Sequence, residues 1–262
     1  GQAIVLTRND DYFAGPAKIE NIVFKIVSDD NAKALQLQSG ELNLSQVTPK
    51  DAQNFANSDT YTVYDMKTSD YRGILYNFNN DYWTANKDII PAINYAIDRQ
   101  AIIDAVLLGQ GMTAYGPLQR NIYNNENVEH YDYDPEKSKE IMESVGCTMG
   151  EDGFYYRDGE KIGFVISVGA GDQVRLDIAQ AAAQQLKEVG IQVELCGMNQ
   201  AAYMKAAYDR TNTDYDIFFG GYVMGVDPDM YSMLFVSTKD DMINYTSPEI
   251  DELFAQGNAT LD

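Results

Sequence analysis

The feature that most constrains the fold is an alternation of strands and helices in the second half of the chain. It consists of a strand, a helix, a strand, a helix and a strand, at residues 160–168, 173–190, 191–198, 200–210 and 214–225. The long helix 173–190 is amphipathic and ends at Gly190, a residue suited to a helix C-terminus. Because a helix between two strands returns the chain in the same direction, the series predicts a parallel α/β lobe. The long helix should cover one face of its sheet.

The first 80 residues show a shorter alternation. The sequence predicts strands at 20–27, 41–45, 61–66 and 72–80 and helices at 32–40 and 49–57, and the opening segment 1–10 also has the character of a strand. Asp29, Asp30 and Asn31 offer N-caps for the first helix, and Gly40 can end it. Thr48 followed by Pro49 is typical of the start of a helix. This order of elements predicts an α/β layer.

The middle of the chain is predominantly helical. Residues 88–108 have apolar side chains at helical spacing, with Pro91 in the first turn, and the step from Asp98 to Arg99 predicts a break between two helices. A polar and aromatic loop at 115–133 follows. Next come a helix with Asp134 as N-cap, Pro135 at its first position and Gly146 after its end, and a hairpin whose turn is Asp158-Gly159.

The charge of the chain excludes several classes of partner. The 262 residues include 19 Lys and Arg against 40 Asp and Glu, a net charge of −21. Residues 1–76 carry 7 basic and 10 acidic residues and residues 77–262 carry 12 and 30, so the acid is concentrated in the second part. Binding to nucleic acid or to an anionic membrane surface would need a basic face, which the sequence does not offer. No apolar run reaches the ~20 residues of a membrane span.

Cysteine and histidine offer little chemistry. Cys147 and Cys196 have neither metal-binding nor redox spacing, and the sequence leaves open whether they form a disulfide. His130 is the single histidine and stands in the polar loop, where we expect it to be exposed. Zinc sites built from histidine and cysteine are therefore not expected.

Three other kinds of motif have both a structural and a functional interpretation. Gly169-Ala170-Gly171 follows a strand and precedes a helix, but lacks the third glycine of a dinucleotide-binding loop, so we interpret it as a flexible connection. Asp227 and Asp229 flank Pro228 after a strand. Paired carboxylates suit glycoside hydrolysis, but capping of a helix or contact with a ligand is the favoured interpretation. The acidic clusters at 29–31 and 131–137 lack the spacing of a calcium loop and fit helix capping.

Tyrosine is abundant, with 19 residues, and several stand at strand ends: Tyr71, Tyr76, Tyr222 and Tyr231. A tyrosine combines a large apolar surface with a polar tip, which suits a cleft for small polar ligands. Half-buried core tyrosines give the same pattern, and the sequence does not decide between the two.

Several segments, in order and over essentially the whole chain, resemble the peptide and nickel (family 5) extracellular solute-binding proteins of ABC importers. They are LTRNDDYFAG with KIENIVFKIV, DDNAKALQLQSGELNLS, IIPAINYAIDRQAIIDAVLLGQGMTAYGPL, YDYDPEKSKEIMESVG, IAQAAAQQLKEVGIQVEL and INYTSPEIDELF. The resemblance implies a type II periplasmic-binding-protein-like fold with two α/β lobes around a cleft. Residues 1–76 would be part of lobe I and residues 77–262 most of lobe II. The chain would be an internal fragment without the upstream part of lobe I and without the final helix and return strand.

The resemblance also implies a function. The expected protein is not an enzyme and uses no cofactor or metal; it binds a peptide or other small polar ligand outside the cytoplasm and delivers it to an ABC permease in the membrane. In the full-length protein a lipid anchor is expected. A nickel chelate, an oligosaccharide or an opine is the alternative ligand, and a glycoside hydrolase using Asp227 and Asp229 is the alternative from another class.

The same resemblance indicates candidate ligand-binding residues. The segment GYVMGVDPD resembles the family loop whose aspartate pairs with a peptide's α-amino group, but Gly225 stands at the place of that aspartate and Asp227 could replace it. Tyr222 matches the aromatic residue of that loop, and Met224 lies between them. Arg175, at the start of the long helix, is a candidate partner for a ligand carboxylate, and an ordinary surface arginine of a helix is the alternative interpretation. Tyr71 and Arg72 complete the predicted site. They stand on the strand that enters the hinge, which is the expected connection between lobe I and lobe II.

Overall fold

The computed structural model describes residues 2–223, 225 and 243–260. Its centre is a four-stranded sheet in the order β3 (Asp70–Tyr76), β9 (Ile217–Val223), β7 (Gly163–Gly169) and β8 (Gln192–Met198). β7 runs parallel to both β8 and β9, as the alternation of strands and helices predicts. β3 is antiparallel to β9, with Tyr71 opposite Tyr222 and Tyr76 opposite Ile217.

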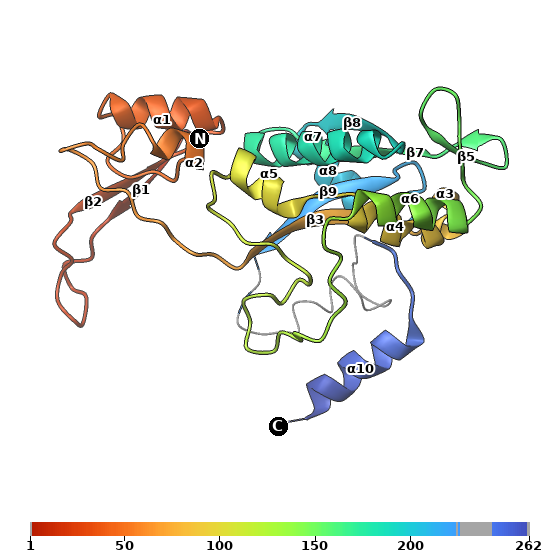
Figure 1. Ribbon diagram of the computed structural model, residues 1–262. Helices are drawn as coiled ribbons and strands as arrows, with labels where there is room; N and C mark the ends of the chain where they lie inside the picture. The colour runs from red at the N-terminus through yellow and green to blue at the C-terminus, as the bar shows by residue number, and fades with distance from the viewer. Residues whose placement is uncertain (1, 224, 226–242, 261–262) are drawn as a thin grey trace.

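Helices cover both faces of this sheet. α7 (Gln173–Glu188) connects β7 to β8 and buries Ala179, Ala182 and Leu186 in a core shared with Ile166 and Val168 of β7. Figure 1 shows α7 running along the sheet, so the predicted crossover helix is confirmed. α8 (Gln200–Ala207) covers the other face, where its residues pack in a second cluster with Leu75 of β3 and Phe218 of β9.

The central part of the chain adds helices to the α7 side of the sheet. They are α3 (Asp81–Ala85), the 3₁₀ helix η1 (Lys87–Ile89), α4 (Ile90–Tyr95), α5 (Arg99–Val106) and α6 (Pro135–Ser144). Asp134 accepts a hydrogen bond from Lys137 N at 2.9 Å, so the predicted cap is confirmed. The predicted break between two helices at Asp98 and Arg99 is confirmed too, and Asp98 caps α5 by accepting a hydrogen bond from Ala101 N at 2.8 Å. Trp83 is fully buried in the core that these helices share with α7.

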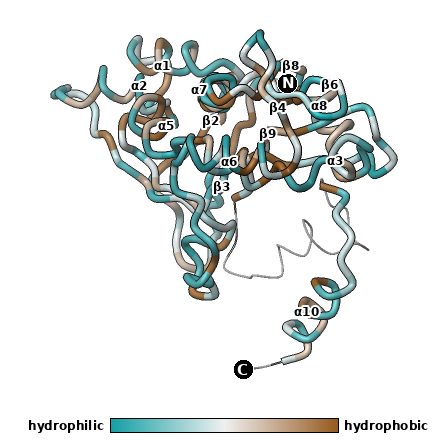
Figure 2. Tube along the Cα trace, turned by 45° about the vertical axis from the view of Figure 1, so that its right-hand side comes forward, coloured by the Kyte–Doolittle hydropathy of each residue, from teal (hydrophilic) through white to brown (hydrophobic). Residues whose placement is uncertain are grey.

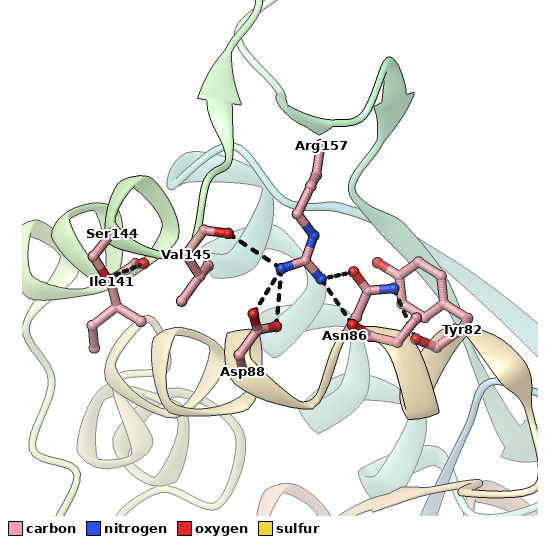
Figure 3. A network of polar contacts seen from close by, with 8 residues as sticks. Tyr82, Asn86, Asp88, Ile141, Ser144, Val145 and Arg157 are labelled. Atoms are coloured by element: carbon pink, nitrogen blue, oxygen red, sulfur yellow. Dashed lines mark hydrogen bonds and ion pairs between the residues drawn. The ribbon is translucent and has the colours of Figure 1, made fainter.

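A small sheet of β4 (Thr148–Met149), β5 (Tyr155–Arg157) and β6 (Glu160–Lys161) follows α6. The predicted turn is confirmed: Asp158 has φ of 53° and Gly159 has φ of 86°, as a tight hairpin turn requires. Arg157, the last residue of β5, reaches back to Asp88 and Asn86 beside η1 and to the carbonyl oxygen of Val145 (Figure 3). These bonds attach the hairpin to the helices.

The first part of the chain consists of β1 (Ala3–Thr7) and β2 (Asn21–Lys25), which pair antiparallel, with α1 (Asp30–Gln38) and α2 (Pro49–Ala52). Asp29 and Thr48 cap the two helices as predicted. The predicted strands at 41–45 and 61–66 are wrong: neither segment is a strand. Apolar alternation alone does not make a strand, because a strand also needs a neighbour with which to exchange hydrogen bonds.

Two further observations concern the arrangement of these parts. β3 belongs to the four-stranded sheet, so that sheet contains residues on both sides of the lobe boundary expected at residue 76. α10 (Pro248–Ala259) extends away from the sheet in both views (Figures 1 and 2), and its apolar Leu253 is 59% exposed. Among the helices of the described residues, none combines the length and the apolar character that crossing a membrane demands.

Candidate ligand-binding site

The carboxyl ends of the parallel strands meet at one end of the central sheet. β7 ends there at Gly169, β9 ends at Val223, and the antiparallel β3 begins at Asp70. Figure 1 shows that this end of the sheet faces the part of the chain that contains β1, β2, α1 and α2. Ligands of open α/β sheets bind beyond the carboxyl ends of the strands, so this is where the fold favours a site.

Two arginines converge at this end, on the face covered by α7. Arg72 Nε lies 3.0 Å from Asp70 Oδ2, and Arg72 Nη2 lies 3.7 Å from Asp172 Oδ2. The same Asp172 oxygen lies 3.2 Å from Arg175 Nε. Each arginine side chain keeps about a quarter of its surface exposed, at 29% for Arg72 and 23% for Arg175. Two guanidinium groups and two carboxylates thus form one cluster, which we call the arginine pair.

The donors of the arginine pair are only partly used. Arg72 Nη1 and Arg175 Nε are both buried without a hydrogen-bond partner, since the contact of Arg175 Nε with Asp172 is an ion pair without hydrogen-bond geometry. A guanidinium carries five N–H donors in a planar fork that matches a carboxylate. The two unused donors are buried, but each arginine side chain is partly exposed, so the exposed part of the pair suits a ligand that carries a carboxylate.

Gly221 makes room for the arginine pair. A Cβ atom at this position would lie 2.9 Å from the carbonyl oxygen of Tyr71, 3.1 Å from Arg175 Nη2 and 3.3 Å from Arg72 Cγ. Any larger residue would therefore displace the arginines or separate β3 from β9. Asp172 positions them from the other side: it caps α7 by accepting a hydrogen bond from Arg175 N at 3.0 Å, while its second oxygen faces the two guanidinium groups.

Two tyrosines occupy the opposite face of the same strands. Tyr71 and Tyr222 are directly opposite each other across β3 and β9, and Tyr222 packs against the cluster formed by Leu75 and Tyr203. The ring of Tyr71 lies over Gly73, where its hydroxyl would be 3.0 Å from a Cβ atom. Burial raises the pKa of Tyr71, and the charge of Arg99 partly opposes this shift.

The structure therefore brings four of the six predicted site residues to one end of the sheet, but on two faces: Arg72 and Arg175 on the α7 side, Tyr71 and Tyr222 on the α8 side. Met224 and Asp227, and with them Asp229 and Tyr231, lie outside the described residues, so their place in the site stays a prediction. Sequence reasoning did not identify Asp70 and Asp172. Asp172 had a signal, because an aspartate directly before a helix is a preferred N-cap.

The other polar residues considered in the sequence, His130 and the two cysteines, are not part of the arginine pair. His130 stacks on Tyr115 with ring centroids 3.8 Å apart, and Tyr115 donates a hydrogen bond of 2.7 Å to Asp132. Cys147 is buried and Cys196 is exposed, and both are free thiols. Among the described residues, no cluster of histidine, cysteine and carboxylate side chains has the geometry to hold a metal ion.

The comparisons with known proteins agree with this architecture. Residues 1–243 match the family model described as bacterial extracellular solute-binding proteins, family 5 Middle. The oligopeptide-binding protein AppA of Bacillus subtilis is 32% identical over the whole chain, and the match covers 49% of that protein. The structure of AppA in complex with a nonapeptide superposes with a TM-score of 0.86 at 29% identity, over 100% of this chain and 53% of AppA.

A more distant structure shows the same fold. NikZ from Campylobacter jejuni in complex with Ni(L-His) superposes with a TM-score of 0.88 at 20% identity, over 53% of its chain. A sheet of this topology, matching half of two-lobed binding proteins, defines the chain as part of a solute-binding protein. The chain belongs to the family 5 bacterial extracellular solute-binding proteins. The predicted family and α/β fold class are thus confirmed, and the chain spans about half the length of the relatives it matches.

Proposed function

We propose that this chain is part of the extracytoplasmic binding component of an ABC importer, which binds peptides between two lobes and delivers them to a membrane permease. The observation that carries this proposal is that the arginine pair, Tyr71 and Tyr222 all lie at the end of the sheet that faces β1 and β2. The relatives support it by their names: AppA is an oligopeptide-binding protein, and its structure contains a nonapeptide.

Each candidate residue has a role in this proposal. Arg72 and Arg175 bind the carboxylate of the peptide, because both guanidinium groups lie beside Asp172 and both side chains are partly exposed. Asp70 and Asp172 hold the two guanidinium groups in place before the ligand arrives. Tyr71 and Tyr222 offer aromatic surface to the peptide, and Met224 and Asp227 extend the site along the segment after β9.

The organisation of the whole protein is part of the proposal. Residues 1–76 belong to lobe I and residues 77–262 to lobe II, except that β3 is built into the sheet of lobe II. The connection between the lobes in this chain would then lie near the start of β3, so that bending there opens and closes the site. In this proposal a lipid anchors the full-length protein to the outside face of the membrane that contains the permease.

Calorimetric titration of the full-length protein with a set of peptides of two to nine residues tests the proposal. We expect at least one peptide to bind, and Arg175→Gln and Arg72→Gln to weaken that binding by ~1–3 kcal/mol each, a loss typical of residues central to an interface. Lys139→Gln, whose target is paired with Glu136 on α6, is the matched control. We also expect this chain alone to bind more weakly, because closure of two lobes supplies much of the contact.

The alternatives appear as other outcomes of the same titration. Binding of a nickel chelate, an oligosaccharide or an opine in place of every peptide would retain the receptor role and replace its ligand. A relative named nickel-binding periplasmic protein, from Escherichia coli, is 23% identical over 76% of the chain. Turnover of a glycoside that depends on Asp227 and Asp229 would contradict the proposal altogether.

A further inference from the structure

The two carboxylates of the arginine pair differ in what they hold. Asp70 lies beside one arginine only, and its Oδ2 accepts a hydrogen bond of 3.0 Å from Arg72 Nε. Asp172 lies between the two arginines, with its Oδ2 3.7 Å from Arg72 Nη2 and 3.2 Å from Arg175 Nε. Its side chain is also the more exposed of the two, at 36% against 21% for Asp70. Asp172 is therefore the carboxylate that a ligand approaching both guanidinium groups meets.

Asp172 is not tightly bound to either arginine. A charge-assisted hydrogen bond between nitrogen and oxygen is ~2.7–2.9 Å long. Both distances from Asp172 Oδ2 are longer, and Arg175 Nε has no hydrogen-bond partner. The other carboxylate oxygen, Asp172 Oδ1, accepts the hydrogen bond of 3.0 Å from Arg175 N that caps α7. Asp172 thus has one oxygen committed to the helix and one that acts on the arginines through its charge.

The arginine pair is balanced in charge, because two guanidinium groups face two carboxylates. The surrounding chain adds no excess of positive charge, since residues 77–262 carry 12 basic against 30 acidic residues. Like charges ~4 Å apart change a binding constant by about fivefold in bulk water, and by more near a protein surface, where the effective dielectric constant is lower. A carboxylate that binds the two arginines therefore gains attraction from two cations and meets repulsion from Asp172.

We propose that Asp172 determines how strongly the site prefers a ligand with a free carboxylate over the same ligand with an uncharged end. Its carboxylate keeps the two guanidinium groups together before a ligand binds, and it weakens their attraction for a carboxylate from outside. This inference rests on the function proposed above, in which a peptide carboxylate binds to Arg72 and Arg175. Removing the charge of Asp172 while keeping the helix cap should raise the preference for the free carboxylate.

Two substitutions remove the charge of Asp172 and keep the cap of α7. Asparagine and serine are both preferred N-cap residues, so Asp172→Asn and Asp172→Ser retain an acceptor for Arg175 N. Two variants of different size guard against misfolding of either one. Asp98→Asn is the matched control, because Asp98 caps α5 in the same way. Asp98 N donates to the side chain of Gln185, which lies about 20 Å along α7 from Asp172 at ~1.5 Å per residue.

The first arm titrates the full-length protein by calorimetry with alanine peptides of two to six residues, each with a free C-terminal carboxylate and as the C-terminal amide. The ratio of the two affinities is the readout, because a loss of folded protein weakens the binding of both forms alike. We expect Asp172→Asn and Asp172→Ser to raise this ratio by about fivefold or more and Asp98→Asn to leave it unchanged. A ratio that stays the same or falls in either variant, with its fold verified by thermal unfolding, overturns the proposal. An equal rise in Asp98→Asn also overturns it, since the effect would then belong to the net charge of the protein.

The second arm separates this inference from the proposed function. It uses this chain as it stands, with acetate as the probe and acetamide as its uncharged counterpart, and follows the side-chain N–H signals of Arg72 and Arg175 by NMR. We expect Asp172→Asn to bind acetate about fivefold more tightly than the wild type does, with no such gain for acetamide. If no peptide binds in the first arm, the proposed function fails, while the acetate titration still decides the role of Asp172. Acetate binding that is no stronger in Asp172→Asn than in the wild type overturns the inference.

Discussion

Arg157 Nη1 donates hydrogen bonds to both carboxylate oxygens of Asp88, at 3.0 and 2.8 Å, across a separation of 69 residues. The same guanidinium donates to the carbonyl oxygens of Val145 and Ala85 and to the side chain of Asn86 (Figure 3). Only 16% of the Arg157 side chain is exposed. One side chain therefore holds the β5 hairpin, the end of α6 and the start of η1 in a fixed arrangement.

Arg157→Ala is expected to lower the free energy of unfolding by ~1–3 kcal/mol, because it leaves several acceptors unpaired at a partly buried position. Urea unfolding measures the change. Lys139→Ala removes an ion pair with Glu136, whose side chain is 78% exposed, and should change stability by less than ~0.5 kcal/mol. Equal effects of the two substitutions would show that Arg157 is only another surface charge.

Asn77 is the second expected point of sensitivity. It is 1% exposed, and its Nδ2 donates to the carbonyl oxygens of Asn212 and Tyr215 at 3.0 and 2.8 Å. Its Oδ1 accepts hydrogen bonds from Asn79 N and from Asn244 Nδ2. Asn77→Leu keeps the volume and removes all four bonds, so we expect a loss of ~2–4 kcal/mol in urea unfolding.

The exposed Asn125 offers the matched control for Asn77. It accepts one local hydrogen bond, from Asn127 N, and Asn125→Leu should cost less than ~0.5 kcal/mol. A small effect of Asn77→Leu would mean that its partners find other hydrogen bonds, and the segment after β3 would then not depend on this residue.

How much the sequence predicts depends on how local each feature is. The limits of α5 and α6 follow from Asp98 and Asp134, because a cap acts within three residues of its own position. The strand expected at 61–66 is wrong because strand formation depends on a partner elsewhere in the chain. The site shows the same limit: Arg72 and Arg175 are each visible in the sequence, but their convergence on Asp172 depends on how β3 and α7 meet across the sheet.

The stability of the protein should fall between about pH 10 and about pH 12. Burial raises the pKa of Tyr203 to about 12, with the charge of Arg175 opposing the shift, and burial also raises the pKa of Tyr155 to about 12. An unfolded tyrosine ionises near pH ~10. Between these values the unfolded state loses protons that the folded state keeps, so the stability present below pH ~10 declines as the pH rises.

Urea unfolding over this pH range, in the wild type and in Tyr203→Phe, measures the effect. The variant loses the hydrogen bond of 3.0 Å to the carbonyl oxygen of Phe219, so it should be less stable near neutral pH and show a shallower decline at high pH. Tyr64→Phe, at a side chain that is 77% exposed, should match the wild type. An identical decline in all three proteins would contradict the raised pKa of Tyr203.

The two cysteines should differ in their reactivity toward a thiol reagent. Cys196 is exposed on β8, whereas Cys147 is 2% exposed and burial raises the pKa of its thiol. Because the thiolate is the reactive form, we expect one labelled site in the native chain, at Cys196, and two in urea. Peptide mapping by mass spectrometry identifies the labelled residues. Absence of any free thiol under both conditions, restored by a reducing agent, would instead reveal a disulfide.

Gly221→Ala tests the arginine pair without changing a charge. The new methyl group would lie 2.9 Å from the carbonyl oxygen of Tyr71 and 3.1 Å from Arg175 Nη2, distances at which the neighbours must move. We expect peptide binding by the full-length protein to weaken by ~1–3 kcal/mol in calorimetric titration, because the guanidinium groups lose their alignment. Gly197→Ala, on β8 with no heavy atom within 4 Å of the added carbon, is the matched control. Thermal unfolding of both variants separates loss of the site from loss of the fold. A stable Gly221→Ala variant with unchanged affinity would show that the ligand carboxylate does not depend on Arg72 and Arg175.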